Sequence, residues 1–313
     1  MAKVQFIEVS ADRAEQRLDN FLRYYLNNVP KSRIYRIIRK GEVRVNKKRA
    51  KPDTKLSEGD VVRVPPVTMA EKTIENPQPS AGLRKALDHA IVFEDSALLA
   101  VNKPSGLAVH GGSGLKLGLI EALRAQRESE PFLELVHRLD RDTSGVVLVA
   151  KKRKSLTLLQ DEFRQKTRVR KTYWCLVKGH WPDGCSVVDA PLLRHEESAS
   201  GERRVSVQAN GKPSRTHFRV LKQYQDCAWV EALPITGRTH QIRVHCQYVG
   251  CPILGDDKYQ DSEAESLASK LGLNRLFLHA AQLTLPHPET REEMTFVADL
   301  DERLKALLLR LKS

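Results

Sequence analysis

The feature that most restricts the possible folds is a series of short apolar runs between residues 89 and 313. The runs read AIVFED, ALLAVNKP, VVLVAKK, KTYWCLVKG, CAWVEALPI, IRVHC and MTFVA, and each has the length and composition typical of a strand. Helical patterns such as SLTLLQDEFRQ and LKALLLRLK interrupt them without the regular strand–helix alternation of a parallel sheet. We therefore expect an α+β fold with a mixed, mainly antiparallel sheet.

The N-terminal part of the chain has a different pattern, with two amphipathic helices. Apolar residues on one face of the first helix are Leu18, Phe21, Leu22, Tyr25 and Leu26. Pro30 separates the helices, Ser32 is the expected N-cap of the second, and Gly41 is its expected C-terminal glycine. The segments EVRVN and GDVVRV then predict strands. This pattern indicates a small helix-helix-strand unit.

Between Pro65 and Asp88 the sequence holds four prolines and few periodic apolar residues, which favours a linker. We therefore predict a small domain over residues 14–66, a linker over 67–88 and a larger domain over 89–313. A chain of 313 residues is long enough for two domains of these sizes.

Basic residues are concentrated on the small unit. The net charge of the chain is +13, and residues 31–55 hold eleven Lys and Arg against two acidic residues. Such a concentration favours a polyanionic partner, with nucleic acid as the first candidate. A solvated basic surface without a ligand is the alternative.

The cysteines and the hydropathy pattern indicate the compartment. The five cysteines are irregularly spaced without a CxxC motif, so neither a zinc site nor a disulfide framework is indicated. No secretory signal and no membrane-length apolar run is visible. We expect a cytoplasmic monomer with reduced thiols and without a bound metal.

Four segments place polar, potentially reactive side chains beside expected strands: NKPSGLAVHGGSG (102–114), HRLDRDTSG (137–145), RKTYWCLV (170–177) and PITGRTHQIRVH (234–245). Taken alone, each has an ordinary structural explanation. The glycine-rich loop fits a turn as well as a phosphate site, and DRDTSG fits a turn with capping side chains. No G-x-S-x-G motif is present, which argues against a serine hydrolase of that type.

Residues 17–64 resemble the S4 RNA-binding domain through RLDNFL, KSRIYRIIRKGEVRVN and KPDTKLSEGD. VNKK stands where Val-Asn-Gly is common in that family, so the strand turn is expected to differ. The resemblance implies that the second helix and the next strand present basic side chains to structured RNA. These side chains are Arg33, Arg36, Arg39, Lys40 and Arg44.

Residues 91–300 resemble the pseudouridine synthases that act on large-subunit ribosomal RNA. HRLDRDTSG and TGRTHQIRVH carry the resemblance, supported by NKPSGLAVH, RKTYWCLVKG, GDDKY and NRLFLHAAQL. It implies isomerisation of specific uridines in 23S ribosomal RNA, without a cofactor. Two alternatives are kept: the same chemistry on transfer RNA or small-subunit RNA, and a non-catalytic assembly factor that binds ribosomal RNA.

The same resemblance assigns roles to individual residues. Asp140 is expected to be the nucleophile that attacks a flipped-out uridine, Arg243 its charge partner, and Tyr173 the aromatic residue packed on the base. A core position is the structural alternative for Tyr173. The remaining candidates are RNA contacts: Arg138, Arg238 and His240. Arg138 is expected to fill the space left by the flipped base, and the other two to contact the RNA backbone.

Overall fold

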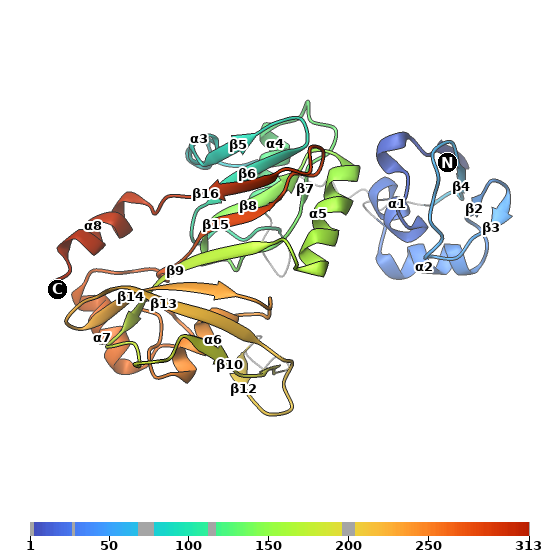
Figure 1. Ribbon diagram of the computed structural model, residues 1–313. Coiled ribbons are helices and arrows are strands. Elements are labelled where there is room, and N and C mark those ends of the chain that lie inside the picture. Colours follow the sequence, from blue (N-terminus) through green and yellow to red (C-terminus); the bar gives the residue numbers. More distant parts are fainter. Residues whose placement is uncertain (1–2, 27–28, 68–77, 112–116, 196–203, 313) are drawn as a thin grey trace. The chain divides into compact units, whose positions relative to one another are not determined.

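The computed structural model describes residues 3–26, 29–67, 78–111, 117–195 and 204–312. The chain divides into two compact units, Met1–Asn76 and Pro77–Ser313 (Figure 1). Among the described residues, no helix is both long and apolar enough to cross a lipid bilayer.

The first unit packs two helices against a small antiparallel sheet. The helices are α1 (Leu18–Tyr25) and α2 (Lys31–Arg39), preceded by the 3₁₀ turn η1 (Ala11–Arg13). The strand order is β1 (Gln5–Glu8), β4 (Val61–Val64), β2 (Arg44–Val45) and β3 (Lys48–Arg49). Apolar residues of both helices and of the β2 and β4 segments form one buried cluster, so the periodicity of the first helix is confirmed.

Three details of the first unit differ from or refine the expectations. The N-cap of α2 is Pro30 rather than Ser32, because the helix already begins at Lys31. Gly41 does follow the helix with a left-handed φ of 71°, as expected. Strand β1 precedes residue 14 and pairs with β4, so the compact unit begins before the predicted boundary.

The turn between β2 and β3 carries the departure from Val-Asn-Gly. Asn46 and Lys47 both have positive φ, 49° and 67°, as a type I′ hairpin turn requires. Asn tolerates this conformation, but Lys has a Cβ that glycine lacks. The turn is therefore of the type that Asn-Gly favours, with a less suitable residue at its second position.

The second unit is built on a large sheet in which most neighbouring strands are antiparallel. The order along its main path is β10 (Val187–Asp189), β13 (Arg215–Gln223), β14 (Cys227–Pro234), β9 (Arg170–Lys178), β15 (Leu278–Pro286), β8 (Ser144–Ala150), β6 (Leu98–Lys103) and β5 (Ile91–Glu94). β16 (Glu293–Val297) pairs with β15 and β7 (Glu134–Leu135) with β8. Only β15 and β8 pair in parallel among the described strands. The predicted α+β class with a mixed, mainly antiparallel sheet is confirmed.

Six helices and a short hairpin complete the described part of the second unit. The helices are α3 (Ala81–His89), α4 (Leu119–Gln126), α5 (Arg153–Gln165), α6 (Gln241–Tyr248), α7 (Ser262–Lys270) and α8 (Glu302–Arg310). The hairpin pairs β11 (Leu192–Arg194) with β12 (Val205–Val207).

Strand β8 is buried along its whole length because helices cover both faces of the sheet. One set of alternate β8 residues packs with α4, and the other set packs with α5. The run VVLVA is therefore continuously apolar although it follows a highly polar segment.

Two sequence expectations are wrong here. IRVHC is not a strand but lies within helix α6, and every residue from Gln241 to Cys246 is buried. Within this buried part of α6 polar and apolar residues alternate, which imitates a strand pattern. The expected linker also extends too far: Ser80 caps α3 by accepting a hydrogen bond from Leu83 N at 3.2 Å. Residues 68–77 of that linker lie outside the described residues.

Candidate active site

Six residues singled out in the larger domain line one cavity of about 600 Å³: Arg138, Asp140, Tyr173, Arg238, His240 and Arg243. They come from the loop before β8, from strand β9, and from helix α6 with the loop that leads into it. Segments far apart in the sequence thus converge on one concave site, which is the usual form of a small-molecule or nucleotide site.

The loop before β8 is held by the segment NKPSG. Lys103 is fully buried, and its Nζ donates to the carbonyl oxygens of Pro104 (2.9 Å), Leu107 (2.8 Å) and Arg141 (2.9 Å). Burial lowers the pKa of Lys103 to about 7. The Oγ of Ser105 also donates to the carbonyl of Asp142 at 2.7 Å. NKPSG is therefore a support for the loop, while residues 112–116 of its glycine-rich continuation lie outside the described residues.

The two ends of the HRLDRDTSG segment are fixed differently. His137 stacks on Phe163 and accepts a hydrogen bond from Leu148 N at 3.1 Å, and burial lowers the pKa of His137 to about 3. Gly145 has a φ of 114°, and a Cβ there would collide with the carbonyl oxygen of Ala280. Only glycine allows β8 to approach β15 this closely at the point where the loop ends.

Asp140 and Tyr173 differ in their exposure and charge. The Asp140 side chain is 38% exposed, so water reaches the carboxylate. Burial raises the pKa of Tyr173, and the nearby charge of Asp140 raises it further. Tyr173 therefore stays a neutral phenol at physiological pH. It lies on β9 and lines the cavity, which does not support the alternative of a purely core residue.

Arg243 is buried in the wall of the cavity, and its hydrogen bonds go to two acidic residues that were not among the predicted site residues. Its Nε and Nη2 donate to Asp256 at 2.7 and 2.5 Å, and Nη2 also contacts Asp257 at 3.1 Å. Burial lowers the pKa of the Arg243 guanidinium, but the carboxylates of Asp256, Asp140 and Asp257 together more than offset burial, so the pKa is raised. The direct Arg243–Asp140 pair expected from the sequence is absent among the described ion pairs, although Asp140 acts on Arg243 through longer-range attraction.

His240 is the closest charged or titratable neighbour of Asp140 among the ion contacts of the described residues. Its Nε2 lies 3.9 Å from Asp140 Oδ2, and its side chain is 12% exposed. Arg238 is partly buried, and its Nε donates to the carbonyl of Pro213 at 3.1 Å. Arg138 is exposed at the mouth of the same site. Of these three residues, Arg138 has the side chain most open to a large ligand.

Lys171 is a cavity residue that the sequence interpretation passed over. It precedes Tyr173 by two on β9, so the two side chains share one face of the strand. Burial, together with the nearby charge of Lys166, lowers the pKa of Lys171 to about 8. The alternation of side chains along β9 could have indicated Lys171 once Tyr173 was assigned to the site. Nothing in the sequence indicated that Asp256, in the segment GDDKY, would bind Arg243.

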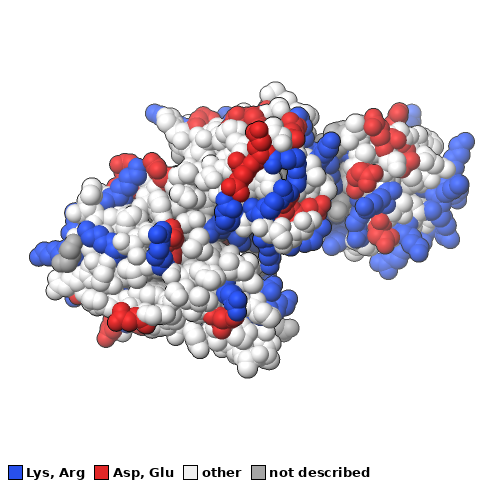
Figure 2. Space-filling view, viewed as in Figure 1, with Lys and Arg blue, Asp and Glu red and all other residues white. Residues whose placement is uncertain are grey.

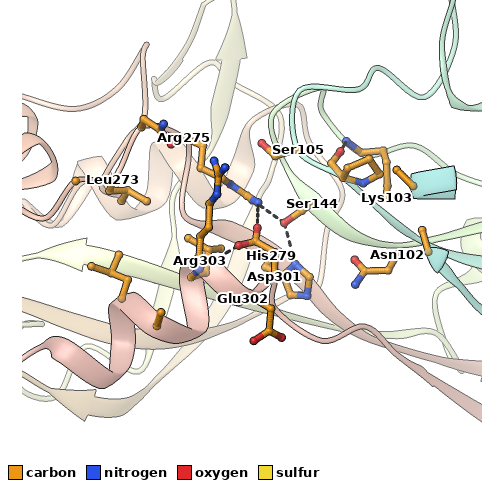
Figure 3. Close-up of a pocket in the computed structure, with 18 of the residues that line it drawn as sticks. Asn102, Lys103, Ser105, Ser144, Leu273, Arg275, His279, Asp301, Glu302 and Arg303 are labelled. Atoms are coloured by element: carbon orange, nitrogen blue, oxygen red, sulfur yellow. Dashed lines mark hydrogen bonds and ion pairs between the residues drawn. The ribbon is translucent and has the colours of Figure 1, made fainter. Parts of the chain in front are cut away.

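Behind the loop lies a second cavity of about 990 Å³, whose lining does not include Asp140 or Tyr173 (Figure 3). Arg275 Nη2 donates to Ser144 Oγ at 2.6 Å, and Ser144 lies 2.8 Å from His279 Nδ1. Because His279 Nε2 faces the carbonyl of Ala298 at 2.8 Å, Nε2 carries the proton and Nδ1 accepts from Ser144. This network fixes the start of β8 from the side away from the candidate active site.

The basic residues predicted on the first unit are mostly on its surface. Arg36, Arg39, Lys40 and Arg44 are exposed, and Arg33 is partly buried. Lys and Arg side chains crowd the part of this unit where Figure 1 labels β2 and β3 (Figure 2). No group of three or more His, Cys, Asp or Glu side chains suited to a metal ion occurs within the described residues.

Comparison with known proteins defines the class. Residues 97–248 match the family model of RNA pseudouridylate synthase, and residues 16–62 match that of the S4 domain. The chain belongs to the RNA pseudouridylate synthase family, whose members are isomerases, and it carries an N-terminal S4 domain.

Individual relatives are similar over nearly the whole chain. Ribosomal large subunit pseudouridine synthase C of Vibrio cholerae is 54% identical over 99% of this chain and 98% of its own length. The protein of the same name from Escherichia coli K12 is 54% identical over 99% of this chain and 97% of its own length. The solved structure of human RNA pseudouridylate synthase domain containing 4 has a TM-score of 0.61 at 32% identity, over 74% of this chain and 97% of that one.

Proposed function

We propose that the chain converts specific uridines of large-subunit ribosomal RNA into pseudouridine, with Asp140 as the nucleophile. The observation that carries this proposal is the single cavity lined by Asp140, Tyr173 and Arg243, which three separate segments supply. The relatives named for the ribosomal large subunit support the choice of RNA.

The reaction breaks the bond between uracil N1 and ribose C1′ and joins C1′ to C5 of the same base. The C5 proton leaves and N1 gains a proton, so nothing is oxidised or hydrolysed. An ionised carboxylate can form a transient covalent bond with the base or the sugar during this exchange. Asp140 is open enough to water for its charge to be stabilised before the RNA enters.

A uridine stacked in RNA must leave the stack to reach Asp140. In the proposed complex Tyr173 packs on the face of the extruded base, because a neutral phenol ring provides an apolar stacking surface. The exposed Arg138 fills the space left by that base. Arg238 is assigned to the RNA backbone, and Lys171 adds a further basic group beside the nucleotide.

We further propose that the first unit binds structured RNA through Arg33, Arg36, Arg39, Lys40 and Arg44. Removing one side chain that neutralises a phosphate should reduce the slope of log affinity against log salt by about 0.7–0.9. Replacing Arg36 and Arg39 together by Gln should therefore weaken RNA binding most at low salt. We expect the enzyme to act as a monomer.

Tritium release from 5-tritiated uridine in deproteinised large-subunit RNA tests the proposal. The wild type should release tritium, and Asp140→Asn should release none while binding RNA with unchanged affinity. Asp142→Asn is the matched control, since Asp142 lies two residues away and pairs with the exposed Arg141 at 3.0 Å. An Asp140→Asn variant that keeps turnover would refute the nucleophile assignment.

The same assay separates the alternatives. Release from transfer RNA or small-subunit RNA, but not from large-subunit RNA, would keep the chemistry and change the substrate. Tight binding of large-subunit RNA with no release from any of these RNAs would favour an assembly factor.

A further inference from the structure

His240 is held at the entrance to α6 in a conformation that points both ring nitrogens at protein groups. It is the N-cap residue of the helix, with φ 52° and ψ 21°. Nδ1 lies 2.7 Å from Tyr259 Oη, and Nε2 lies 3.9 Å from Asp140 Oδ2. With 12% of its side chain exposed, His240 is poorly placed for the RNA backbone contact expected from the sequence.

The hydrogen bonds of Tyr259 decide which nitrogen of His240 carries the proton. Tyr259 is 3% exposed, and its oxygen accepts a hydrogen bond from Val205 N at 3.1 Å. A phenol has one proton to donate, and Nδ1 of His240 is the acceptor within reach. With Nδ1 acting as an acceptor, a neutral His240 carries its proton on Nε2, the nitrogen that faces Asp140.

The charges around His240 favour that neutral form. Burial lowers the pKa of His240, and Arg243 and Lys258 lower it further. Asp140 and Asp256 act in the opposite direction without reversing the shift. At neutral pH the ring is therefore uncharged, and its Nε2–H faces the Asp140 carboxylate from 3.9 Å.

We infer that His240 is a positioning residue for the isomerisation, fixed by Tyr259 so that its Nε2–H holds one carboxylate oxygen of Asp140. With Oδ2 held, Oδ1 is free to attack the nucleotide, and a neutral donor weakens the nucleophile less than an ion pair would. The 3.9 Å separation exceeds hydrogen-bond length, but such contacts commonly tighten only when substrate is bound. The inference rests on the proposed function, in which Asp140 is the nucleophile.

Two substitutions separate positioning from structural support. In His240→Gln the terminal amide nitrogen reaches the place of Nε2 and keeps a donor toward Asp140. In His240→Asn the shorter amide ends near the place of Nδ1, so it keeps the Tyr259 contact and loses the donor. Asn also adopts a left-handed backbone more readily than Gln, so a purely structural role predicts that Asn is the better replacement.

The positioning role predicts the opposite order in single-turnover and steady-state tritium release. Turnover should fall about 100-fold in His240→Asn and less than about tenfold in His240→Gln, the range expected for losing one aligned donor. The KM for RNA, the binding affinity and its salt slope should stay unchanged in both variants. Equal turnover of the two variants, a better Asn variant or a reduced salt slope would overturn the inference.

A measurement that needs no activity checks the tautomer. In protein labelled with ¹⁵N-histidine, the His240 signals are those missing from His240→Asn, and at pH 7.5 they should show a protonated Nε2. A proton on Nδ1 would overturn the inference and leave the proposed function intact. If the wild type releases no tritium from any RNA tested, the proposed function itself fails, and the positioning role fails with it.

Discussion

Replacing Arg243 by Met should destabilise the second unit severely, because it leaves a buried carboxylate without its cation. Arg243 is 3% exposed and Asp256 is not exposed at all. After the substitution, Asp256 Oδ1 keeps two backbone donors, Lys258 N at 2.9 Å and Tyr259 N at 3.1 Å, but Oδ2 loses its hydrogen bond from Arg243. Breaking one side of a buried pair typically costs about 3–5 kcal/mol. For a unit of this size that lowers Tm by about 6–20 °C.

Tryptophan fluorescence during urea denaturation measures this effect in the second unit alone. All three tryptophans of the chain lie there, at positions 174, 181 and 229. Arg215→Met is the matched control, because Arg215 pairs with Asp189 at the surface, where both side chains are about half exposed. An exposed pair of this kind contributes about 0–1 kcal/mol. Equal midpoints for the two variants would refute the reasoning about burial.

A companion substitution separates folding from chemistry. Asp256→Asn in the Arg243→Met background removes the buried charge, so the double variant should recover most of the lost stability. If the double variant folds but does not release tritium, Arg243 contributes to turnover beyond its structural pairing. Full recovery of turnover would limit Arg243 to supporting the wall of the cavity.

Three further outcomes are expected. The stability of the wild type relative to Lys103→Met should increase from pH 7 to 9 by up to about 1.4 kcal/mol per pH unit, since the unfolded chain keeps a proton that the native Lys103 has lost. If the difference in unfolding free energy between the two proteins is the same at pH 7, 8 and 9, the three carbonyl acceptors instead keep Lys103 in its ammonium form. Gly145→Ala should cost more than about 3 kcal/mol, because its Cβ would meet a backbone oxygen. Gly179→Ala, with φ 72° and open space around it, should cost only about 1–2 kcal/mol in the same urea assay. Lys47→Gly should stabilise the first unit by about 0.5–1 kcal/mol, measured by thermal circular dichroism, because Asn46 and residue 47 form a type I′ turn. An unchanged or lower Tm would contradict the assigned turn strain.

The sequence predicted those parts of the fold that depend on local periodicity. Helix α1 follows from its apolar spacing, strand β8 from its continuous apolar run, and Gly41 from helix-ending geometry. Helix α6 was missed because the burial of all residues from Gln241 to Cys246 removes the one-sided pattern on which helix prediction depends.

The candidate site was predictable in its residue types but not in its pairings. Asp140, Tyr173 and Arg243 do line one cavity. The carboxylate that binds Arg243 is Asp256, because a tight turn brings GDDKY beneath α6, and no sequence spacing encodes that approach. For the same reason, the contact between His240 and Tyr259 becomes visible only in three dimensions.

The parallel pairing of β15 with β8 has a consequence for the order of events during synthesis. Ser144 and His279 lie 135 residues apart in the chain, so at 5–20 residues per second the second leaves the ribosome roughly 7–27 s after the first. During that interval β8, which follows the loop carrying Asp140, lacks its β15 neighbour, so the sheet is incomplete. Contacts of such long sequence separation also slow folding. The first unit can fold meanwhile, whereas the cavity around Asp140 can close only after β15, which contributes Leu278 to its lining, has been synthesised.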